Sequence, residues 1–223
     1  MSLEYRLIPV TRVEQNCALL WCSKSRRAVV TDPGAEPDRI MAAADELGIT
    51  IERALLTHGH VDHANGAREF ADRIGVPLEG PHAADDFLFD GLPDMARRLG
   101  LPHHPLFRPD RWLEEGTTIR FGAETLVVLH CPGHTPGHVV YFSRDARLAI
   151  VGDILFRGAI GRWDGQGGSL KTLVHSIRER LFPLGTGVRF IPGHGRTSTF
   201  GYERAWNPFV MDDAFRNPFL QEH

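Results

Sequence analysis

The chain has few cysteines and no long hydrophobic run. Its three cysteines, Cys17, Cys22 and Cys131, are odd in number and form no CxxC pair. They therefore predict neither a disulfide framework nor a structural zinc knuckle, and we expect reduced thiols. No apolar run approaches the ~20 residues that a membrane-spanning helix needs, and Glu4 and Arg6 interrupt any signal-peptide core. We expect a cytoplasmic protein with no membrane segment.

An excess of charge of one sign is also missing. The formal net charge is -3, with 24% charged and 42% hydrophobic residues. These values are ordinary for a globular protein and give no signal of a nucleic-acid partner. A length of 223 residues suffices to bury a full core, so we expect residues 1–223 to form a single domain. The sequence does not indicate the oligomeric state.

Periodicity and turn residues predict two β–α halves. The first half has expected helices at 36–48 and 64–74 and expected strands at 5–10, 18–21, 28–30 and 51–56. The second half has an expected helix at 169–182 and expected strands at 117–121, 124–129, 138–142, 147–151 and 188–191. Between the halves, residues 91–112 are rich in Pro, Arg and His without a clear period. We interpret them as a flexible flap or lid.

The most informative stretch directly follows the apolar run 54–56. It contains four potential metal ligands within six residues: His58, His60, Asp62 and His63. Imidazole and carboxylate groups suit a borderline-soft ion such as Zn²⁺, and the absence of nearby cysteine argues against a thiolate-rich structural site. The pattern predicts a catalytic metal site where a strand ends. Extended backbone lets His58 and His60 face one ion, whereas Asp62 and His63, beyond a bend, can reach a second.

Three further candidate ligands each follow a glycine at the end of an expected strand: His134, Asp153 and His194. Glycine lets the backbone turn sharply or approach closely. A carboxylate can bridge two cations, and Asp153 is the natural candidate for that role. The seven residues together predict a centre for two divalent metal ions, zinc first, with iron or manganese as alternatives. A bridging water, its pKa lowered toward ~7 by zinc, would be the nucleophile, and Asp62 would orient it.

These residues resemble the metallo-β-lactamase-fold hydrolase superfamily, whose hallmark is an HxHxDH motif followed by isolated His, Asp and His ligands. The resemblance spans nearly the whole chain. It implies an α+β fold, the αββα sandwich, in which two mixed β-sheets face each other, helices cover the outsides and the metals lie at one sheet edge. It also implies two ligand sets with Asp153 as the bridge: His58, His60 and His134 for the first metal, and Asp62, His63 and His194 for the second.

Within that superfamily the sequence looks like the short bacterial glyoxalase II branch, the hydroxyacylglutathione hydrolases. The similarity rests on six segments, 15–17, 31–34, 132–138, 152–156, 161–162 and 192–195. That branch cleaves S-D-lactoylglutathione to D-lactate and glutathione, which implies a hydrolase for small-molecule thioesters. The resemblance places Arg162 near the glutathione moiety, although a salt bridge within its own loop is the alternative. Long members add a C-terminal helical domain with glutathione contacts; here only a short tail follows His194, which leaves other thioesters open.

Other activities stay open at this point. Persulfide dioxygenases use one iron and share the HxHxDH loop and a Gly-Arg-x-Asp segment like residues 161–164, although the run 194–197 favours the hydrolase. Acyl-homoserine lactone hydrolases have Tyr three residues after the bridging Asp, where this chain has Phe156. True metallo-β-lactamases usually lack that Asp, so Asp153 argues against antibiotic hydrolysis. We expect His138 to support the site structurally and Cys131 to be a packed thiol.

Overall fold

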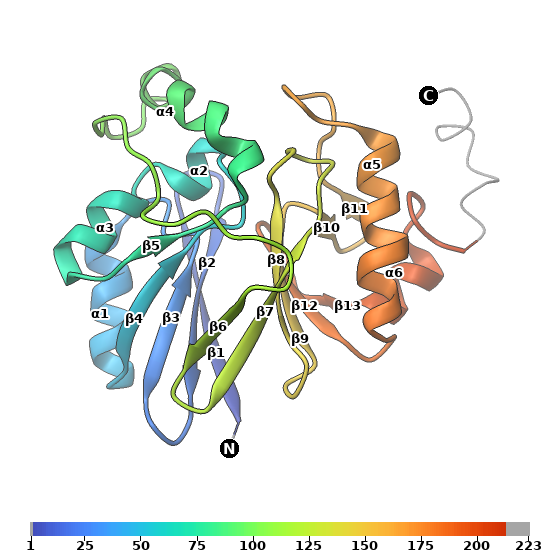
Figure 1. Cartoon of the computed structure of the whole chain (residues 1–223), viewed down its shortest axis with the longest axis horizontal. Helices are drawn as coiled ribbons and strands as arrows, with labels where there is room; N and C mark the ends of the chain where they lie inside the picture. The colour runs from blue at the N-terminus through green and yellow to red at the C-terminus, as the bar shows by residue number, and fades with distance from the viewer. Residues whose placement is uncertain (1, 213–223) are drawn as a thin grey trace.

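The computed structural model describes residues 2–212 and shows two facing β-sheets with helices on the outside (Figure 1). The first sheet has the strand order β1-β2-β3-β4-β5. Its strands are β1 (Leu3–Val10), β2 (Gln15–Cys22), β3 (Arg27–Thr31), β4 (Thr50–Leu55) and β5 (Leu78–Glu79). Strands β1 to β3 are antiparallel, whereas β3, β4 and β5 are parallel, so the sheet is mixed.

The second sheet has the strand order β13-β12-β9-β8-β7-β6. Its strands are β6 (Thr118–Phe121), β7 (Glu124–His130), β8 (Val139–Ser143), β9 (Leu148–Gly152), β12 (Arg189–Pro192) and β13 (Ser198–Thr199). Because β9 and β12 are parallel neighbours, their carboxyl ends reach the same edge of the sheet. A separate small hairpin, β10 (Leu155–Phe156) and β11 (Ala159–Ile160), follows β9.

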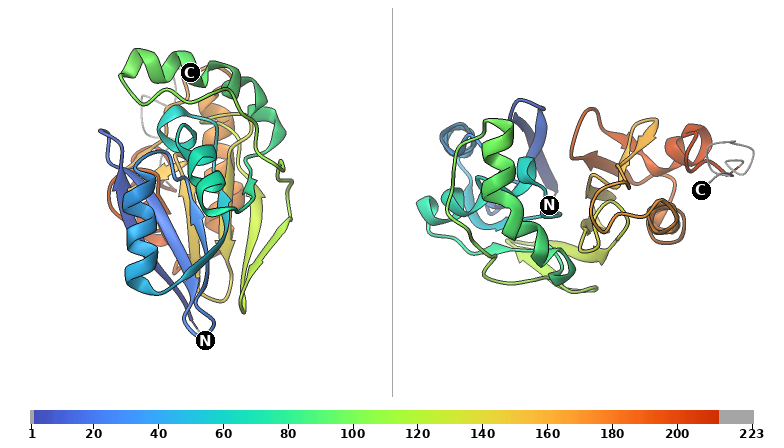
Figure 2. Two further views of the ribbon diagram at one scale, coloured as in Figure 1. Left: turned by 90° about the vertical axis from the view of Figure 1, so that its left-hand side faces the viewer. Right: turned by 90° about the horizontal axis from the view of Figure 1, so that it is seen from above.

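Helices cover the outer faces of both sheets (Figure 2). Helices α1 (Pro37–Leu47) and α3 (Ala67–Ile74) lie on the first sheet, and α5 (Leu170–His175) and α6 (Phe200–Trp206) lie on the second. Three clusters of buried side chains correspond to these layers: one under α1 and α3, one between the sheets and one under α5 and α6. The predicted α+β αββα sandwich is confirmed.

Strand β2 shows how the sequence forms these layers. All eight of its residues are buried. Since successive side chains of a strand point to opposite faces, Leu19 packs in the cluster beneath the helices and Leu20 in the cluster between the sheets. A continuous apolar run therefore serves two layers, which explains why this segment lacks the alternation of a half-exposed strand.

The helix expected at 64–74 is two helices. Helix α2 (Val61–Ala64) begins three residues earlier, and α3 follows after a break at residues 65–66. A Cβ on Gly66 would lie 2.8 Å from the carbonyl oxygen of Gly34, so close packing of the two backbones requires glycine at the break. The helix expected at 169–182 is also divided, into α5, a π-helical turn η2 (Ser176–Leu181) and a 3₁₀ turn η3 (Phe182–Leu184).

The interpretation of residues 91–112 as an irregular flap is wrong for its first part. Residues 83–85 form the 3₁₀ turn η1 (Ala83–Asp85), and helix α4 (Asp86–Leu99) follows and runs into the supposed flap. Its buried residues Phe89, Leu92 and Ala96 recur at helical spacing. Pro93 inside the helix obscured this period, because proline removes one backbone donor and is rare in helix interiors. Residues 100–112 are irregular, with Phe107 and Trp112 partly buried against the core.

The described residues after His194 contribute to the second half of the fold. Strand β13 pairs with β12, and α6 packs its Phe200 into the outer cluster. Residues 213–223 lie outside the described residues. Among residues 2–212, no helix has the length and apolar character that crossing a membrane requires.

Candidate metal centre

Four segments that each follow a strand bring the seven predicted ligands together at one edge of the sandwich. The segment after β4 contains His58 and His60, and Asp62 and His63 follow on the first turn of α2. His134 lies between β7 and β8, Asp153 follows β9, and His194 follows β12. The ligands come from both sheets, so the centre depends on the packing of the two halves.

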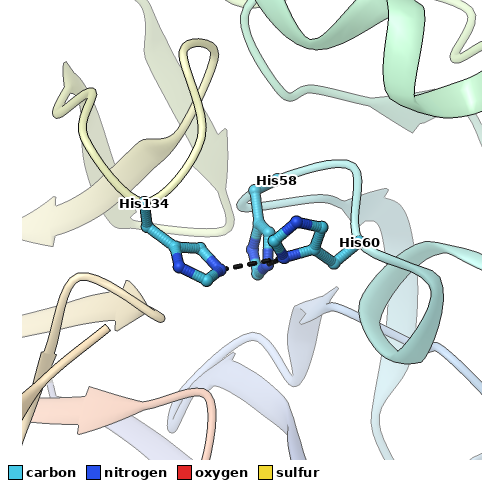
Figure 3. Close-up of side chains that lie close together, drawn as sticks. All are labelled: His58, His60 and His134. Carbon is cyan, nitrogen blue, oxygen red and sulfur yellow. Dashed lines mark hydrogen bonds between the residues drawn. The ribbon is translucent and has the colours of Figure 1, made fainter. Parts of the chain in front are cut away.

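The first group of candidate ligands consists of three imidazoles, His58, His60 and His134, which point toward one another (Figure 3). His60 Nδ1 lies 3.1 Å from His58 Nε2 and 2.9 Å from His134 Nε2. Ligand atoms about 2.1 Å from a tetrahedral ion lie roughly 3.4 Å from one another. These nitrogens therefore have the spacing of donors that share one ion.

The second group consists of Asp62, His63 and His194. Asp62 Oδ2 lies 3.1 Å from His194 Nε2 and 3.6 Å from His63 Nε2. Asp153 lies between the two groups: its Oδ1 is 3.4 Å from His63 Nε2, and its Oδ2 is 3.7 Å from both His134 Nε2 and His194 Nε2. The two carboxylate oxygens can thus face both groups, as a bridging ligand requires.

Two buried polar atoms in the centre lack a hydrogen-bond partner among the described residues, His63 Nε2 and Asp153 Oδ1. An unpaired buried polar atom is costly unless something else satisfies it. A cation between these two atoms would do so. The donor set of five imidazoles and two carboxylates, without thiolate, fits zinc, iron or manganese.

Hydrogen bonds to the second ring nitrogen orient four of the five candidate imidazoles. Nδ1 of His134 donates to the carbonyl oxygen of Arg162 at 2.8 Å, and Nδ1 of His194 donates to the carbonyl oxygen of Val13 at 3.1 Å. Nδ1 of His63 donates to Asp32 Oδ2 at 3.0 Å, and Nδ1 of His58 lies 3.0 Å from Thr57 Oγ1. A proton on Nδ1 leaves the lone pair of Nε2 free for a metal.

Asp32 is a supporting residue that was not predicted from the sequence. Its carboxylate accepts hydrogen bonds from both the backbone N–H and the hydroxyl of Thr57, each at 2.7 Å, besides the one from His63. Through Thr57 it also holds His58. Asp32 therefore orients one ligand of each group, and its position in the turn after β3 was the sequence signal that could have identified it.

Asp85 links two ligand loops and was also not assigned from the sequence. Its buried carboxylate accepts from the N–H of Gly59 at 3.0 Å, the hydroxyl of Thr135 at 2.8 Å and the N–H of Gly137 at 2.5 Å. Burial raises the pKa of Asp85 to about 6, although these hydrogen bonds act in the opposite direction. The carboxylate ties the loop that contains His58 to the loop that contains His134.

Close packing explains the glycine before Asp153 and the glycine before His194. A Cβ on Gly193 would lie 2.0 Å from Asp153 Oδ1, and one on Gly152 would lie 2.6 Å from Thr57 Oγ1. Gly152 also has a positive φ of 49°, which disfavours other residues. As expected, His138 is a supporting residue: its ring stacks on His58 at 4.7 Å, and its Nε2 accepts from the N–H of Asp153 at 3.1 Å.

A cavity of about 770 Å³ opens above the centre. It is lined by five of the candidate ligands, His60, Asp62, His134, Asp153 and His194, and by Arg162. The Arg162 side chain is 78% exposed and its Nε donates to Asp164 Oδ1 at 3.1 Å, so the within-loop salt bridge is present. Cys131, in contrast, is buried with its pKa raised to about 12 by burial, as expected of a packed thiol.

The chain is similar in sequence to one protein family and to several known proteins. The sequence profile described as "Metallo-beta-lactamase superfamily" matches residues 10–194, which include all seven candidate ligands. "Hydroxyacylglutathione hydrolase GloC" of Haemophilus influenzae is 41% identical, and the alignment covers 94% of this chain and 98% of that protein. "Persulfide dioxygenase ETHE1, mitochondrial" of Homo sapiens is 33% identical, over 85% of this chain and 69% of that protein.

Solved structures of similar fold cover almost the whole chain. TTHA1623 in a di-iron-bound form has 35% sequence identity and a TM-score of 0.83, covering 92% of this chain and 100% of that one. The BLEG-1 B3 metallo-beta-lactamase has 30% identity and a TM-score of 0.85, covering 93% and 99%. The relatives thus share the fold and differ in the activity that their names state.

Proposed function

The chain belongs to the metallo-β-lactamase superfamily, and we propose that it is a metal-dependent thioester hydrolase with S-D-lactoylglutathione as the first candidate substrate. One observation carries the proposal: Asp153 lies within 3.7 Å of candidate ligands of both groups at a cavity, in a chain 41% identical to a hydroxyacylglutathione hydrolase. The substrate is thus a small-molecule thioester. Because both sheets supply ligands, we further propose that the whole chain acts as one domain.

In this proposal His58, His60 and His134 hold one divalent ion, Asp62, His63 and His194 hold a second, and Asp153 lies between them. Zinc is the first candidate, with iron or manganese as alternatives. Divalent ions bound there would supply Lewis acidity toward a carbonyl oxygen and a water-derived nucleophile at neutral pH. No serine or cysteine nucleophile of the chain is required.

The side chains of the cavity floor have separate proposed roles. Asp62 contributes Oδ2 to the second group and lines the cavity, so it can both bind and accept a hydrogen bond from the attacking water. His58 and His63 are fully buried beneath it, where they exclude solvent from the inner side of the centre. Arg162, exposed at the rim, is the proposed substrate contact.

Persulfide dioxygenase activity is the second candidate, favoured by the 33% identity to the human enzyme of that name. The second ligand group supports the hydrolase instead, because an enzyme that uses one iron requires only one of the two groups. The identity to the hydrolase is also higher and extends over more of both chains. The acyl-homoserine lactone reaction has no comparable support in the described residues.

The experiment measures thiol release from S-D-lactoylglutathione by the metal-loaded protein, in air and without oxygen. Equal, metal-dependent release under both conditions supports the hydrolase. Oxygen uptake with glutathione persulfide, without hydrolysis of the thioester, would replace it with the dioxygenase. A chromogenic β-lactam belongs in the same assay because of the similarity to BLEG-1. Cleavage of the β-lactam but not of the thioester would overturn the proposal.

A further inference from the structure

Exposed hydrophobic side chains gather at the cavity above the candidate metal centre. The described residues contain six large exposed hydrophobic side chains, and three of them line this cavity: Val13, Met95 and Leu99. They are 58%, 44% and 53% exposed, respectively. Burying such surface is favourable by about 25 cal/mol per Å². A ligand with an apolar part would therefore gain affinity at this place.

The three side chains come from two segments that are distant in the sequence. Val13 lies in the turn between β1 and β2, and Met95 and Leu99 lie on α4, four residues apart and hence on one helix face. Together with Val61 of α2, they form what we term the apolar wall. All four residues belong to the first half of the chain, and three of them expose large apolar side chains at the cavity.

The second half of the chain contributes Arg162 to the cavity, together with the apolar side chains of Phe156, Ala159 and Ile160, none of which is among the exposed large hydrophobic side chains. Among the described residues that line the cavity, Arg162 is the one Lys or Arg side chain, and it pairs with Asp164. The apolar wall offers no cation to a carboxylate. A charged group placed against the wall would lose water without gaining a partner, which is unfavourable.

We propose that the apolar wall binds an apolar acyl chain of the thioester substrate, while the thiol carrier extends toward Arg162 and solvent. This inference rests on the proposed thioester hydrolysis. A thioester carbonyl held at the centre has two substituents, which must extend in different directions. Common thiol carriers are charged, so the uncharged wall suits the acyl side. The inference thereby revises the first candidate substrate: within the proposed class of thioesters, those with an apolar acyl chain of several carbons should be preferred to S-D-lactoylglutathione, whose acyl group is short and polar.

Two S-alkyl glutathiones test the wall by binding alone, because thioethers cannot be hydrolysed. S-methylglutathione and S-hexylglutathione carry the same charges and differ by five methylenes. A fully buried methylene strengthens binding by about fourfold and a half-buried one by about twofold. We therefore expect calorimetry with the metal-loaded protein to show binding of the hexyl compound that is about thirtyfold tighter. Equal dissociation constants would overturn the inference.

Matched variants test whether the apolar wall causes the tighter binding of the hexyl compound. Leu99→Gln and Met95→Gln should each lower the hexyl-to-methyl ratio by about threefold or more, because they remove apolar contacts. Leu106→Gln is the control, since Leu106 is 58% exposed but does not line the cavity, and it should leave the ratio unchanged. A ratio that falls equally in all three variants, or in none, would contradict the wall.

Rates of hydrolysis distinguish failure of the acyl-chain inference from failure of the proposed thioesterase function. We expect kcat/KM for S-hexanoylglutathione to exceed that for S-D-lactoylglutathione, and Leu99→Gln to reduce the difference. Hydrolysis of both thioesters at equal kcat/KM, with binding independent of alkyl length, would overturn the inference and leave the thioesterase proposal standing. No metal-dependent hydrolysis of either thioester would overturn the proposed function, and the acyl assignment with it.

Discussion

The two groups of candidate ligands both lie beside Asp153 but have opposite electrostatic surroundings. In the first group burial, followed by the neighbouring imidazoles, lowers the pKa of His58 well below its usual range and that of His60 to about 3. In the second group burial acts in the same direction, but the carboxylates of Asp153, Asp62 and Asp32 outweigh it and raise the pKa of His63. The first group is rich in neutral lone pairs, whereas the second is rich in carboxylates.

This difference in histidine pKa affects how the two groups would bind metal. At neutral pH the first group offers unprotonated nitrogens. In the second group Asp62 raises the pKa of His194 against the effect of burial, so His63 and His194 keep their protons to higher pH than the imidazoles of the first group do. A metal ion entering the second group must displace those protons, because ligands bind in their deprotonated form. We therefore expect occupancy of the two groups to respond differently to the same conditions.

The largest effect should come from removing the residue that the groups share. Asp153→Ala deletes the bridging carboxylate, so we expect loss of metal from both groups and a fall in kcat/KM of about 1,000-fold or more, equivalent to about 4 kcal/mol of transition-state stabilisation. Elemental analysis and thioester hydrolysis measure the two effects. Asp164→Asn, an exposed carboxylate near the cavity, is the control. Unchanged metal content in Asp153→Ala would contradict the shared ligand.

A smaller effect on both groups should follow from changing Asp32. Asp32→Asn weakens the hydrogen bonds that orient His63 directly and His58 through Thr57. Supporting residues of this kind contribute about 10-fold to 100-fold to metal affinity. Competition with a chelator would measure the loss. Asp45→Asn, on the exposed surface of α1, serves as the control. Affinity equal to that of the wild type would show that Asp32 has only a structural role.

The third prediction separates the groups by pH. The pKa values of His63 and His194 are raised, so increasing pH removes protons that compete with the metal. Affinity of the second group should thus increase with pH, by up to about tenfold per unit for each proton displaced. The low pKa values of His58 and His60 predict an affinity of the first group that is flat near neutral pH. Titrations at several pH values test this, and equal slopes for both groups would disprove the comparison.

The smallest effect concerns the rim. Arg162 is 78% exposed and already paired with Asp164, so Arg162→Gln should alter kcat/KM for a glutathione thioester by less than about fivefold, through KM. Salt should reduce the effect further, since exposed charges are screened. A larger loss of kcat/KM that comes from kcat rather than from KM would place Arg162 in the catalytic machinery.

The layers of the fold and the candidate ligands could be predicted from the sequence. The residues that orient those ligands could not. The first four candidate ligands could be predicted because they follow one strand closely in the chain: His58, His60, Asp62 and His63. The other three were predicted from the glycine before each of them and from the family resemblance: His134, Asp153 and His194. The structure brings all seven together, and their binding of metal stays a prediction.

Asp32 and Asp85 were not predicted from the sequence, for a physical reason. Each acts through hydrogen bonds to residues at least 25 positions away, and a lone Asp in a turn has no local pattern that reveals such partners. The apolar wall was missed in the same way, because it needs Val13 and α4 side by side. Helix α4 itself was hidden by Pro93, although Phe89, Leu92 and Ala96 kept the helical spacing.

The most direct test of this account is the number of metal ions bound per chain. The protein would be stripped with a chelator, reconstituted with zinc at about pH 8, freed of excess zinc and subjected to elemental analysis. Two complete ligand groups predict about two ions per chain for the wild type and about one for His194→Ala, which keeps the three imidazoles of the first group. One ion per chain in both proteins would contradict the two-metal centre.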